Sequence, residues 1–332
     1  MKNNTFQEIW NKINECEKIL ISLHSGPDGD SLGSCTAMKY VLEKQDKDVT
    51  LISYDYLIES LQSMSITKEI DFKKDILDVN LENFDLLLCI DISTPEMIGK
   101  YKRDYQTPKN IFTINIDHHP TNKYYANLNY VDEHQPSATS ILLEMFKQSD
   151  IEFDSELSTR LLLGLCTDCG FFTFAPLAEK ALKQASFLIE NGGKYLERVV
   201  APILHQQPLN LMKYYSLLVM KLKFDKNKRF AYSLTTAEEI KKLGLNLAEI
   251  RLGPNHLQYL KEFEFIFTLV EVGNSIKGSF RSQKKVDVSL FAKNLGGGGH
   301  KSAAAFHLEN VSLKQAEKQV LETIEKVGIH KF

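Results

Sequence analysis

Histidines and aspartates gather in four short stretches of this chain. The stretches are "HSGPDGDSLGS" at residues 24–34, "CID" at 89–91, "DHH" at 117–119 and "GLCTDCGFF" at 164–172. So many carboxylates would repel one another in a common site unless cations neutralised them. Oxygen ligands mixed with imidazole suit Mn²⁺ and related divalent ions. A carboxylate that bridges two such ions about 3.5–4 Å apart creates a site for in-line displacement at phosphorus.

A simpler interpretation exists for each of these residues taken alone. A single aspartate after a strand is usually a turn residue or a helix cap, which is an adequate account of Asp91 or Asp168 in isolation. A pair of histidines can be exposed without a function. Five acidic or imidazole groups at successive strand ends are harder to explain as caps, so we favour a metal site. The candidate residues are His24, Asp28, Asp30, Asp91, Asp117, His118, His119 and Asp168.

The elements that would position these residues are apolar runs in the first half of the chain. We predict strands at residues 19–23, 48–53, 84–91 and 111–117, separated by helices and apolar on both faces, as in a buried parallel sheet. Ligands bind beyond the carboxyl ends of the strands in such sheets, which is where the candidate residues fall. A helix follows the first strand, and Asp30 or Ser31 could cap it.

Beyond these strands, helical spacing of Leu182, Ala185, Leu188 and Ile189 predicts an apolar helix face that ends at Gly192-Gly193. Residues up to about 222 are predicted to be helical and to link two halves. The second half contains a predicted hairpin with its turn at Gly273-Asn274, and a final helix that begins with the capping box of Ser312 and Gln315. We therefore expect domains at 1–193 and 223–332, with a helical linker at 194–222.

Composition narrows the function classes. The chain has 332 residues and a net charge of -3. Two ordinary domains fit this length, and the charge predicts no general attraction to long nucleic acid or to anionic membranes. Because no apolar run approaches a membrane span and the first residues lack a signal-peptide core, we expect a cytoplasmic protein. The five cysteines are an odd number, which argues against a full disulfide framework, and we interpret Cys166 and Cys169 as small buried residues.

Taken together, the four stretches resemble the motifs of the DHH phosphoesterase family. "GSFRS" and "GGGGHKSAAAF" in the second half resemble the signature of the DHHA1 domain, which is found in two-domain members of that family. The matches occur in the expected order and cover most of the chain. The resemblance implies an α/β protein, with an N-terminal parallel-sheet DHH domain, a smaller α/β DHHA1 domain and a cleft between them.

The same resemblance implies a metal-dependent phosphodiesterase with two divalent ions, expected to be Mn²⁺. One ion would be held by His24, Asp28 and Asp91, and the other by Asp30, Asp91, His118 and Asp168. Asp91 and a water or hydroxide would bridge them. His119 would face the scissile phosphate as an acid or charge stabiliser, and Asp117 would orient its neighbours.

In the second domain, Arg281 and the glycine run at residues 296–299 are candidates for substrate binding. A glycine run is usually a flexible linker, and a lone arginine on a hairpin is usually solvated. Here His300 follows the glycines, whose exposed N–H groups could cradle a phosphate that Arg281 grips with two hydrogen bonds. With the resemblance, we favour substrate binding by Arg281, Gly297, Gly298, Gly299 and His300.

The family members most similar in layout hydrolyse short RNA, linear dinucleotides such as pApA, or 3′-phosphoadenosine 5′-phosphate (pAp). The resemblance therefore implies an oligoribonuclease or pAp phosphatase, and the sequence does not rank these substrates. One alternative is an inorganic pyrophosphatase or polyphosphatase on the same core. Another is a nucleotide sensor without catalysis, which would not need the complete ligand set. Neither a membrane nor a long duplex is an expected partner, and a homodimer is compatible with the sequence.

Overall fold

A computed structural model describes residues 3–102, 104–173, 177–251, 253–282, 286–299 and 301–331. The chain divides into two compact units, Met1–Gln206 (unit 1) and Gln207–Phe332 (unit 2). Each unit contains its own six-stranded sheet. The division falls inside residues 194–222, because the helix at 195–205 belongs to unit 1 and the helix at 209–220 belongs to unit 2.

The sheet of unit 1 is parallel throughout. Its strands are β1 (Lys18–Ser22), β2 (Asp48–Ser53), β3 (Asp71–Phe72), β4 (Leu86–Ile90), β5 (Phe112–Asp117) and β6 (Leu128–Val131). The spatial order is β3-β2-β1-β4-β5-β6, so the four strands predicted from the sequence are confirmed as neighbours. The strand order reverses between β1 and β4, and a crevice for ligands opens at such a switch point.

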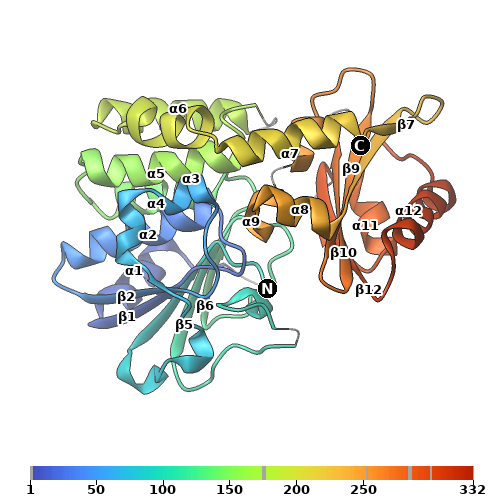
Figure 1. Cartoon of the computed structure of the whole chain (residues 1–332). Coiled ribbons are helices and arrows are strands. Elements are labelled where there is room, and N and C mark those ends of the chain that lie inside the picture. Colours follow the sequence, from blue (N-terminus) through green and yellow to red (C-terminus); the bar gives the residue numbers. More distant parts are fainter. Residues whose placement is uncertain are drawn as a thin grey trace. The chain divides into compact units, whose positions relative to one another are not determined.

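Long helices pack on one face of this sheet (Figure 1). They are α1 (Phe6–Asn14), α2 (Gly29–Glu43), α4 (Ala138–Gln148), α5 (Ser155–Asp168) and α6 (Ala178–Glu190), followed by the π-helix η5 (Tyr195–His205). Strand residues such as Ile19, Leu88 and Ile114 share an apolar core with these helices. Helix α5 lies directly against α2, which brings the end of one close to the start of the other.

The other face of the sheet is covered by short connections instead of long helices. Leu20, Leu87 and Cys89 of the strands pack there against Ile76 and Ile98 of the connections. The 3-10 helices η2 (Ile76–Asp78), η3 (Leu81–Asn83) and η4 (Pro95–Met97) lie on this face, whereas α3 (Glu59–Gln62) and the 3-10 helix η1 (Ser65–Glu69) place Leu61 and Ile66 in the core shared with the long helices. We expected the strands to be separated by helices. The connection from β1 to β2 contains the long helix α2, whereas the described part of the connection from β4 to β5 contains the short η4 instead.

Unit 2 contains a mixed sheet of order β11-β12-β10-β9-β8-β7, in which β8 and β9 are parallel and the other neighbouring strands are antiparallel. The strands are β7 (Lys223–Asp225), β8 (Phe230–Thr235), β9 (Phe265–Val272), β10 (Ser275–Ser282), β11 (Gly298–Gly299) and β12 (Ala303–Glu309). The predicted hairpin is confirmed as β9 and β10. Gly273 in its turn has φ 56°, a conformation that favours glycine.

Helices pack on both faces of the second sheet. An aromatic core that includes Phe267, Phe280 and Phe306 lies under α11 (Ser289–Asn294) and α12 (Leu313–Val327). On the other face are α7 (Leu209–Met220), α8 (Ala237–Leu243), α9 (Leu247–Ile250) and α10 (Gly253–Leu257). The predicted capping box of Ser312 and Gln315 is confirmed at the start of α12.

Helix α6 confirms the predicted helix but not all of its predicted apolar face. Ala185 and Leu188 are buried, whereas Leu182 and Ile189 are 51% and 44% exposed. Gln184 is buried instead, because its side chain accepts a hydrogen bond from Ser140 of α4. A helix face that mixes apolar and polar contacts cannot be located from hydrophobic spacing alone.

Candidate metal centre

The loop after β1 brings the first candidate ligands together. The His24 imidazole Nε2 lies 3.8 Å from Asp28 Oδ1 and 3.6 Å from Asp91 Oδ2. Asp28 is also the N-cap of α2, because its side chain accepts hydrogen bonds from the N–H groups of Asp30 and Ser31. The expectation that Asp30 or Ser31 caps this helix is therefore wrong.

Asp30 is held by a different helix. Its carboxylate accepts hydrogen bonds from Ala138 N at 2.6 Å, from Thr139 N at 3.1 Å and from the Thr139 hydroxyl at 2.9 Å. These donors stand at the N-terminus of α4, where the helix dipole favours a negative charge. Asp30 is 1% exposed, so its position is fixed by the packing of α2 against α4.

Asp91 lies between the other candidates. It follows β4 with a left-handed backbone, φ 63°, and its side chain is 2% exposed. One carboxylate oxygen, Oδ2, faces His24, and the other, Oδ1, lies 3.4 Å from His118 Nε2. The two oxygens of a single carboxylate thus face two groups of residues.

The "DHH" stretch ends β5 and supplies an ordered histidine pair. Asp117 Oδ1 accepts a hydrogen bond from His118 N at 2.9 Å and contacts His119 Nδ1 at 2.8 Å. Its other oxygen accepts from Asn122 Nδ2 at 2.6 Å. When His119 Nδ1 carries the proton, Nε2 lies on the far side of the ring from Asp117, and the side chain is 29% exposed.

Asp168 reaches the centre from the last residue of α5. Its Oδ2 lies 3.4 Å from His118 Nε2, and the side chain is 29% exposed. The close approach of α5 depends on glycine, because a Cβ at Gly164 would lie 2.5 Å from Asp30 Oδ1 and a Cβ at Gly33 would lie 2.6 Å from Arg160 O. A carboxylate at a helix C-terminus is disfavoured by the helix dipole, so Asp168 calls for a cationic neighbour.

Electrostatics agree with a site for cations. Burial opposes ionisation of Asp91, but His118 and His24 outweigh it and lower the pKa of Asp91. Burial raises the pKa of Asp168 to about 6, a value to which Asp28 and Asp91 contribute and which His118 opposes. Among the described residues, Asp91 Oδ1 and His118 Nε2 are buried without a hydrogen-bond partner. Buried polar atoms in such a position call for a missing partner.

The donor set fits two divalent cations. Its residues form three groups, and the ligand atoms of each group lie within 4.8 Å of one another. The groups are His24, Asp28 and Asp91; Asp30, His118 and Asp168; and Asp91, His118 and His119. When all are ionised, Asp28, Asp30, Asp91 and Asp168 carry four negative charges, which two divalent ions would balance. All four stretches singled out in the sequence therefore meet in unit 1.

Sequence reasoning missed three residues that hold these ligands in place. They are Thr139, which bonds Asp30; Asn122, which bonds Asp117; and Asp55, whose carboxylate accepts a hydrogen bond from Gly26 N at 2.8 Å. Asn122 lies in the region directly after "DHH" and could have been suspected. No local pattern marks Thr139 or Asp55, because their partners are distant in the sequence. Cys166 and Cys169 are buried free thiols, as predicted.

The candidate substrate residues of unit 2 are only partly described. Arg281 Nε donates to Asn255 Oδ1 and Nη1 donates to Phe280 O, both at 2.8 Å. Burial lowers the pKa of Arg281 to about 10. Gly298 and Gly299 form β11 and pair with Ala305 and Ala304, so this run is not a flexible linker. A Cβ at Gly297 would overlap the Phe306 side chain at 2.6 Å, whereas Gly298 faces open space. His300 lies outside the described residues.

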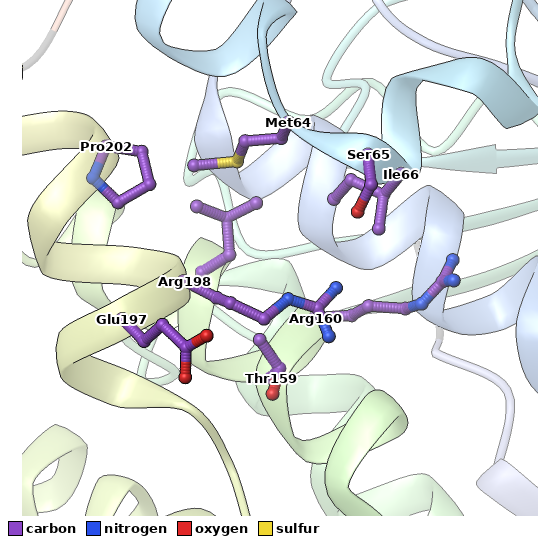
Figure 2. A pocket seen from close by; sticks show the side chains of 9 residues that line it. Met64, Ser65, Ile66, Thr159, Arg160, Glu197, Arg198 and Pro202 are labelled. Atoms are coloured by element: carbon purple, nitrogen blue, oxygen red, sulfur yellow. The ribbon is translucent and has the colours of Figure 1, made fainter.

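A cavity of about 190 Å³ elsewhere in unit 1 contains none of the predicted site residues (Figure 2). Arg198 reaches into it from η5, and Arg160 lines it from α5. Arg160 forms two 2.7 Å bonds to Glu69, and Arg198 pairs with Glu156. Since carboxylates already occupy both guanidinium groups, the cavity is a poor site for phosphate.

Comparison with known families agrees with the geometry. Residues 18–165 match the model of the DHH family, N-terminal domain, and residues 232–327 match the DHHA1 domain. The chain therefore contains a DHH-family N-terminal domain and a DHHA1 domain. Among the described residues, none of the helices combines the length and apolar character needed to cross a bilayer.

Individual relatives match most of the chain. The bifunctional oligoribonuclease and PAP phosphatase NrnA of Thermus thermophilus is 26% identical over 307 residues, covering 92% of this chain and 89% of the relative. An exopolyphosphatase-related protein from Bacteroides fragilis has a TM-score of 0.85 at 21% identity and covers 97% of this chain and 95% of its own. RecJ in complex with Mn²⁺, also from Thermus thermophilus, has a TM-score of 0.54 at 13% identity, covering 98% of this chain and 54% of RecJ. These two structures establish the shared fold alone.

Proposed function

We propose that this DHH-family hydrolase cleaves short oligoribonucleotides or linear dinucleotides to nucleoside monophosphates, and that it also removes the 3′-phosphate of pAp. The observation that carries the proposal is the position of Asp91, whose two oxygens face His24 and His118 separately at 3.6 and 3.4 Å. A carboxylate shared by two cation sites is what a two-metal phosphoesterase requires. The two activities for which the Thermus thermophilus relative is named support the substrate class.

The ligand assignment follows the two sides of Asp91. His24 and Asp28 would hold one ion with Asp91 Oδ2, and Asp30, His118 and Asp168 would hold the other with Asp91 Oδ1. Mn²⁺ suits this mixture of oxygen and imidazole ligands. When bound, two such ions supply an activated water and stabilise charge on the phosphoryl group.

His119 would deliver a proton to the leaving oxygen. The carboxylate of Asp117 contacts Nδ1 at 2.8 Å and so fixes the ring with Nε2 directed away from that carboxylate. Burial lowers the pKa of His119, but Asp117 and Asp91 outweigh it and raise the pKa, which favours the protonated form that a general acid needs. Asp117 acts through this contact and is therefore a positioning residue.

In unit 2, Arg281 and the glycines at 297–299 would bind the part of the substrate that does not react, together with His300. Arg281 has no carboxylate partner among the described residues, and Gly298 offers an open backbone edge. Binding energy from such remote groups can position the reacting phosphate. This requirement for a nucleotide favours a nuclease over an inorganic pyrophosphatase.

A panel of substrates tests the proposal. Purified protein with Mn²⁺ is offered a short RNA, pApA, pAp and pyrophosphate at equal concentration, and the products are separated by chromatography. We expect mononucleotides from the short RNA and pApA, and AMP from pAp. Fast hydrolysis of pyrophosphate with little action on dinucleotides would identify a pyrophosphatase. Nucleotide binding without turnover would identify a sensor.

A further inference from the structure

Two lysines and three aromatic rings form a cluster on unit 1, at the ends of β2 and β3. Lys73 Nζ lies 4.3 Å from the ring centroid of Tyr56 and 5.7 Å from that of Tyr54. Lys100 Nζ lies 4.9 Å from the Tyr54 ring, and the rings of Tyr56 and Phe72 are 5.4 Å apart. We call these five residues the tyrosine–lysine patch.

The patch continues the edge of the sheet that carries the metal centre. The strands β4, β1, β2 and β3 are neighbours in that order, and each ends at this edge. The residues that follow or closely follow them are Asp91, His24, Tyr54 and Lys73. Since neighbouring strands are about 4.8 Å apart, the patch begins about one strand spacing from His24.

Backbone contacts also tie the patch to the metal-site loop. Asp55, between the two tyrosines, accepts a hydrogen bond from Gly26 N at 2.8 Å. On the other side, His24 forms a β-bridge with Ile98, two residues before Lys100. The rings and cations are therefore held in a defined position relative to the candidate catalytic residues.

The lysines of the patch contact aromatic rings and no carboxylate among the described residues. Neither Lys73 nor Lys100 forms an ion pair in the part of the chain that the structure describes, and Asp71, nearby, pairs with Lys74 at 3.6 Å. Tyr56 is 52% exposed. Lys73 has a left-handed backbone, φ 62°, which is costly for lysine and places its ammonium group over both rings.

Exposed rings beside such cations are suited to single-stranded nucleic acid. Bases stack on aromatic side chains whatever their sequence, and lysines neutralise the phosphates. We propose that the tyrosine–lysine patch binds the nucleotide adjacent to the scissile phosphate, with its base stacked on Tyr56 and its phosphate near Lys73 and Lys100. This inference rests on the proposed function, because it requires a nucleotide substrate.

The test measures kcat/KM of the Mn²⁺-loaded enzyme on a trinucleotide and on the same trinucleotide with an abasic residue beside the cleaved bond. Tyr56→Ala should lower kcat/KM on the intact trinucleotide about five- to 150-fold, the range expected for one base–aromatic stack. On the abasic substrate, Tyr56→Ala and the wild type should be equal. Tyr56→Phe, which keeps the ring, should recover most of the loss.

Phe224 and Lys226 of unit 2 provide a matched control. Phe224, on the edge strand β7, is also 52% exposed. Lys226 directly follows that strand, and its Nζ lies 5.7 Å from the centroid of the Phe224 ring. Phe224→Ala should leave both substrates unaffected. Equal activity of Tyr56→Ala and the wild type on the intact trinucleotide would overturn the patch while leaving the nuclease function in place.

If the wild type turns over no nucleotide, the proposed function fails, and the patch is then tested by direct binding of the same two trinucleotides. A preference of the wild type for the intact trinucleotide that Tyr56→Ala removes would support the patch. No such preference would overturn it. Thermal unfolding of each variant checks that the fold is retained.

Discussion

The two units present polar clusters of opposite charge, built in different ways. In unit 1, carboxylates and imidazoles from four distant stretches meet at the ends of parallel strands. In unit 2, cations lie along one face of an antiparallel pair, where Lys277 and Arg281 are four residues apart on the same face of β10 and Lys277 stands opposite His307 of β12. A parallel sheet gathers strand ends, whereas an antiparallel pair gathers register partners.

Burial acts on both clusters in the same sense, towards neutrality. It raises the pKa of Asp168 to about 6, with contributions from Asp28 and Asp91. Burial also lowers the pKa of Lys277 to about 7, together with the guanidinium groups of Arg251 and Arg281. Each cluster is therefore costly to charge until a ligand of opposite charge arrives. Because the two clusters have opposite charge, we expect a cation ligand for unit 1 and an anion ligand for unit 2.

The largest effect is expected at Asp91. Asp91→Ala should lower hydrolysis of all substrates by at least about a thousandfold, because metal ions supply several kcal/mol of transition-state stabilisation. Bound Mn²⁺, measured by metal analysis, should fall as well. Asp104→Ala is the control, since Asp104 also has a left-handed backbone, φ 61°. Substantial turnover by Asp91→Ala, or by the wild type after complete chelation, would refute the two-metal mechanism.

A slightly smaller loss is expected at His119. His119→Ala should lower kcat about 10²–10⁴-fold, as is usual for loss of a general acid, while two Mn²⁺ ions per chain remain bound. His134→Ala, an exposed histidine of the same unit, should have no such effect. Loss of one metal equivalent in His119→Ala would mean that the roles of His118 and His119 are reversed.

Arg281 tests the anion site of unit 2. Arg281→Ala should lower kcat/KM for short RNA and pApA about ten- to a hundredfold, the effect of charge-assisted hydrogen bonds, with metal content unchanged. Hydrolysis of bis(p-nitrophenyl) phosphate should suffer much less, because it has no remote nucleotide. Arg229→Ala, an exposed arginine near Glu264, is the matched control. Equal losses on both kinds of substrate would assign Arg281 to the chemistry or to the fold.

The smallest effect is expected from the titration of Lys277. Its pKa is about 7 in the folded chain and 10.5 in the reference state, so the folded chain binds fewer protons between these values. Lys277 therefore makes folding more favourable as pH rises from 7 to 10.5. Over the same rise in pH, Lys277 loses the positive charge that would attract an anion. From about pH 6.5 to about pH 8.5, kcat/KM for nucleotides should fall about two- to fivefold because of Lys277.

Lys277→Arg, which keeps its charge, isolates that effect. The decline over the same pH range should be smaller in Lys277→Arg than in the wild type, measured on the same nucleotide and compared with bis(p-nitrophenyl) phosphate. Identical pH profiles in the two proteins would exclude Lys277 from the anion site.

Local patterns predicted much of unit 1 correctly. Apolar runs located β1, β2, β4 and β5, and the acidic and imidazole residues were expected at their ends, where they lie. One wrong prediction concerned capping, since Asp28 caps α2 and Asp30 instead bonds the N-terminus of α4. Asp28, Asp30 and Ser31 are each of a residue type that can cap a helix. Asp30 instead bonds Ala138 at the start of α4, 108 residues further along the chain, and this contact decides among them.

By itself, the sequence determined β1, β2, β4 and β5, the β9–β10 hairpin and the chemistry of the ligand set, because each depends on neighbours in the chain or on side-chain type. The tertiary structure decided which oxygen of Asp91 faces which histidine, which donors hold Asp30, and that Tyr54, Tyr56 and Lys73 continue the edge of the metal centre. These relations depend on strand order and on the close packing of α5 at Gly164, where an added Cβ would displace a carboxylate. Contacts between distant segments leave no periodic trace in the sequence, so only the folded chain reveals them.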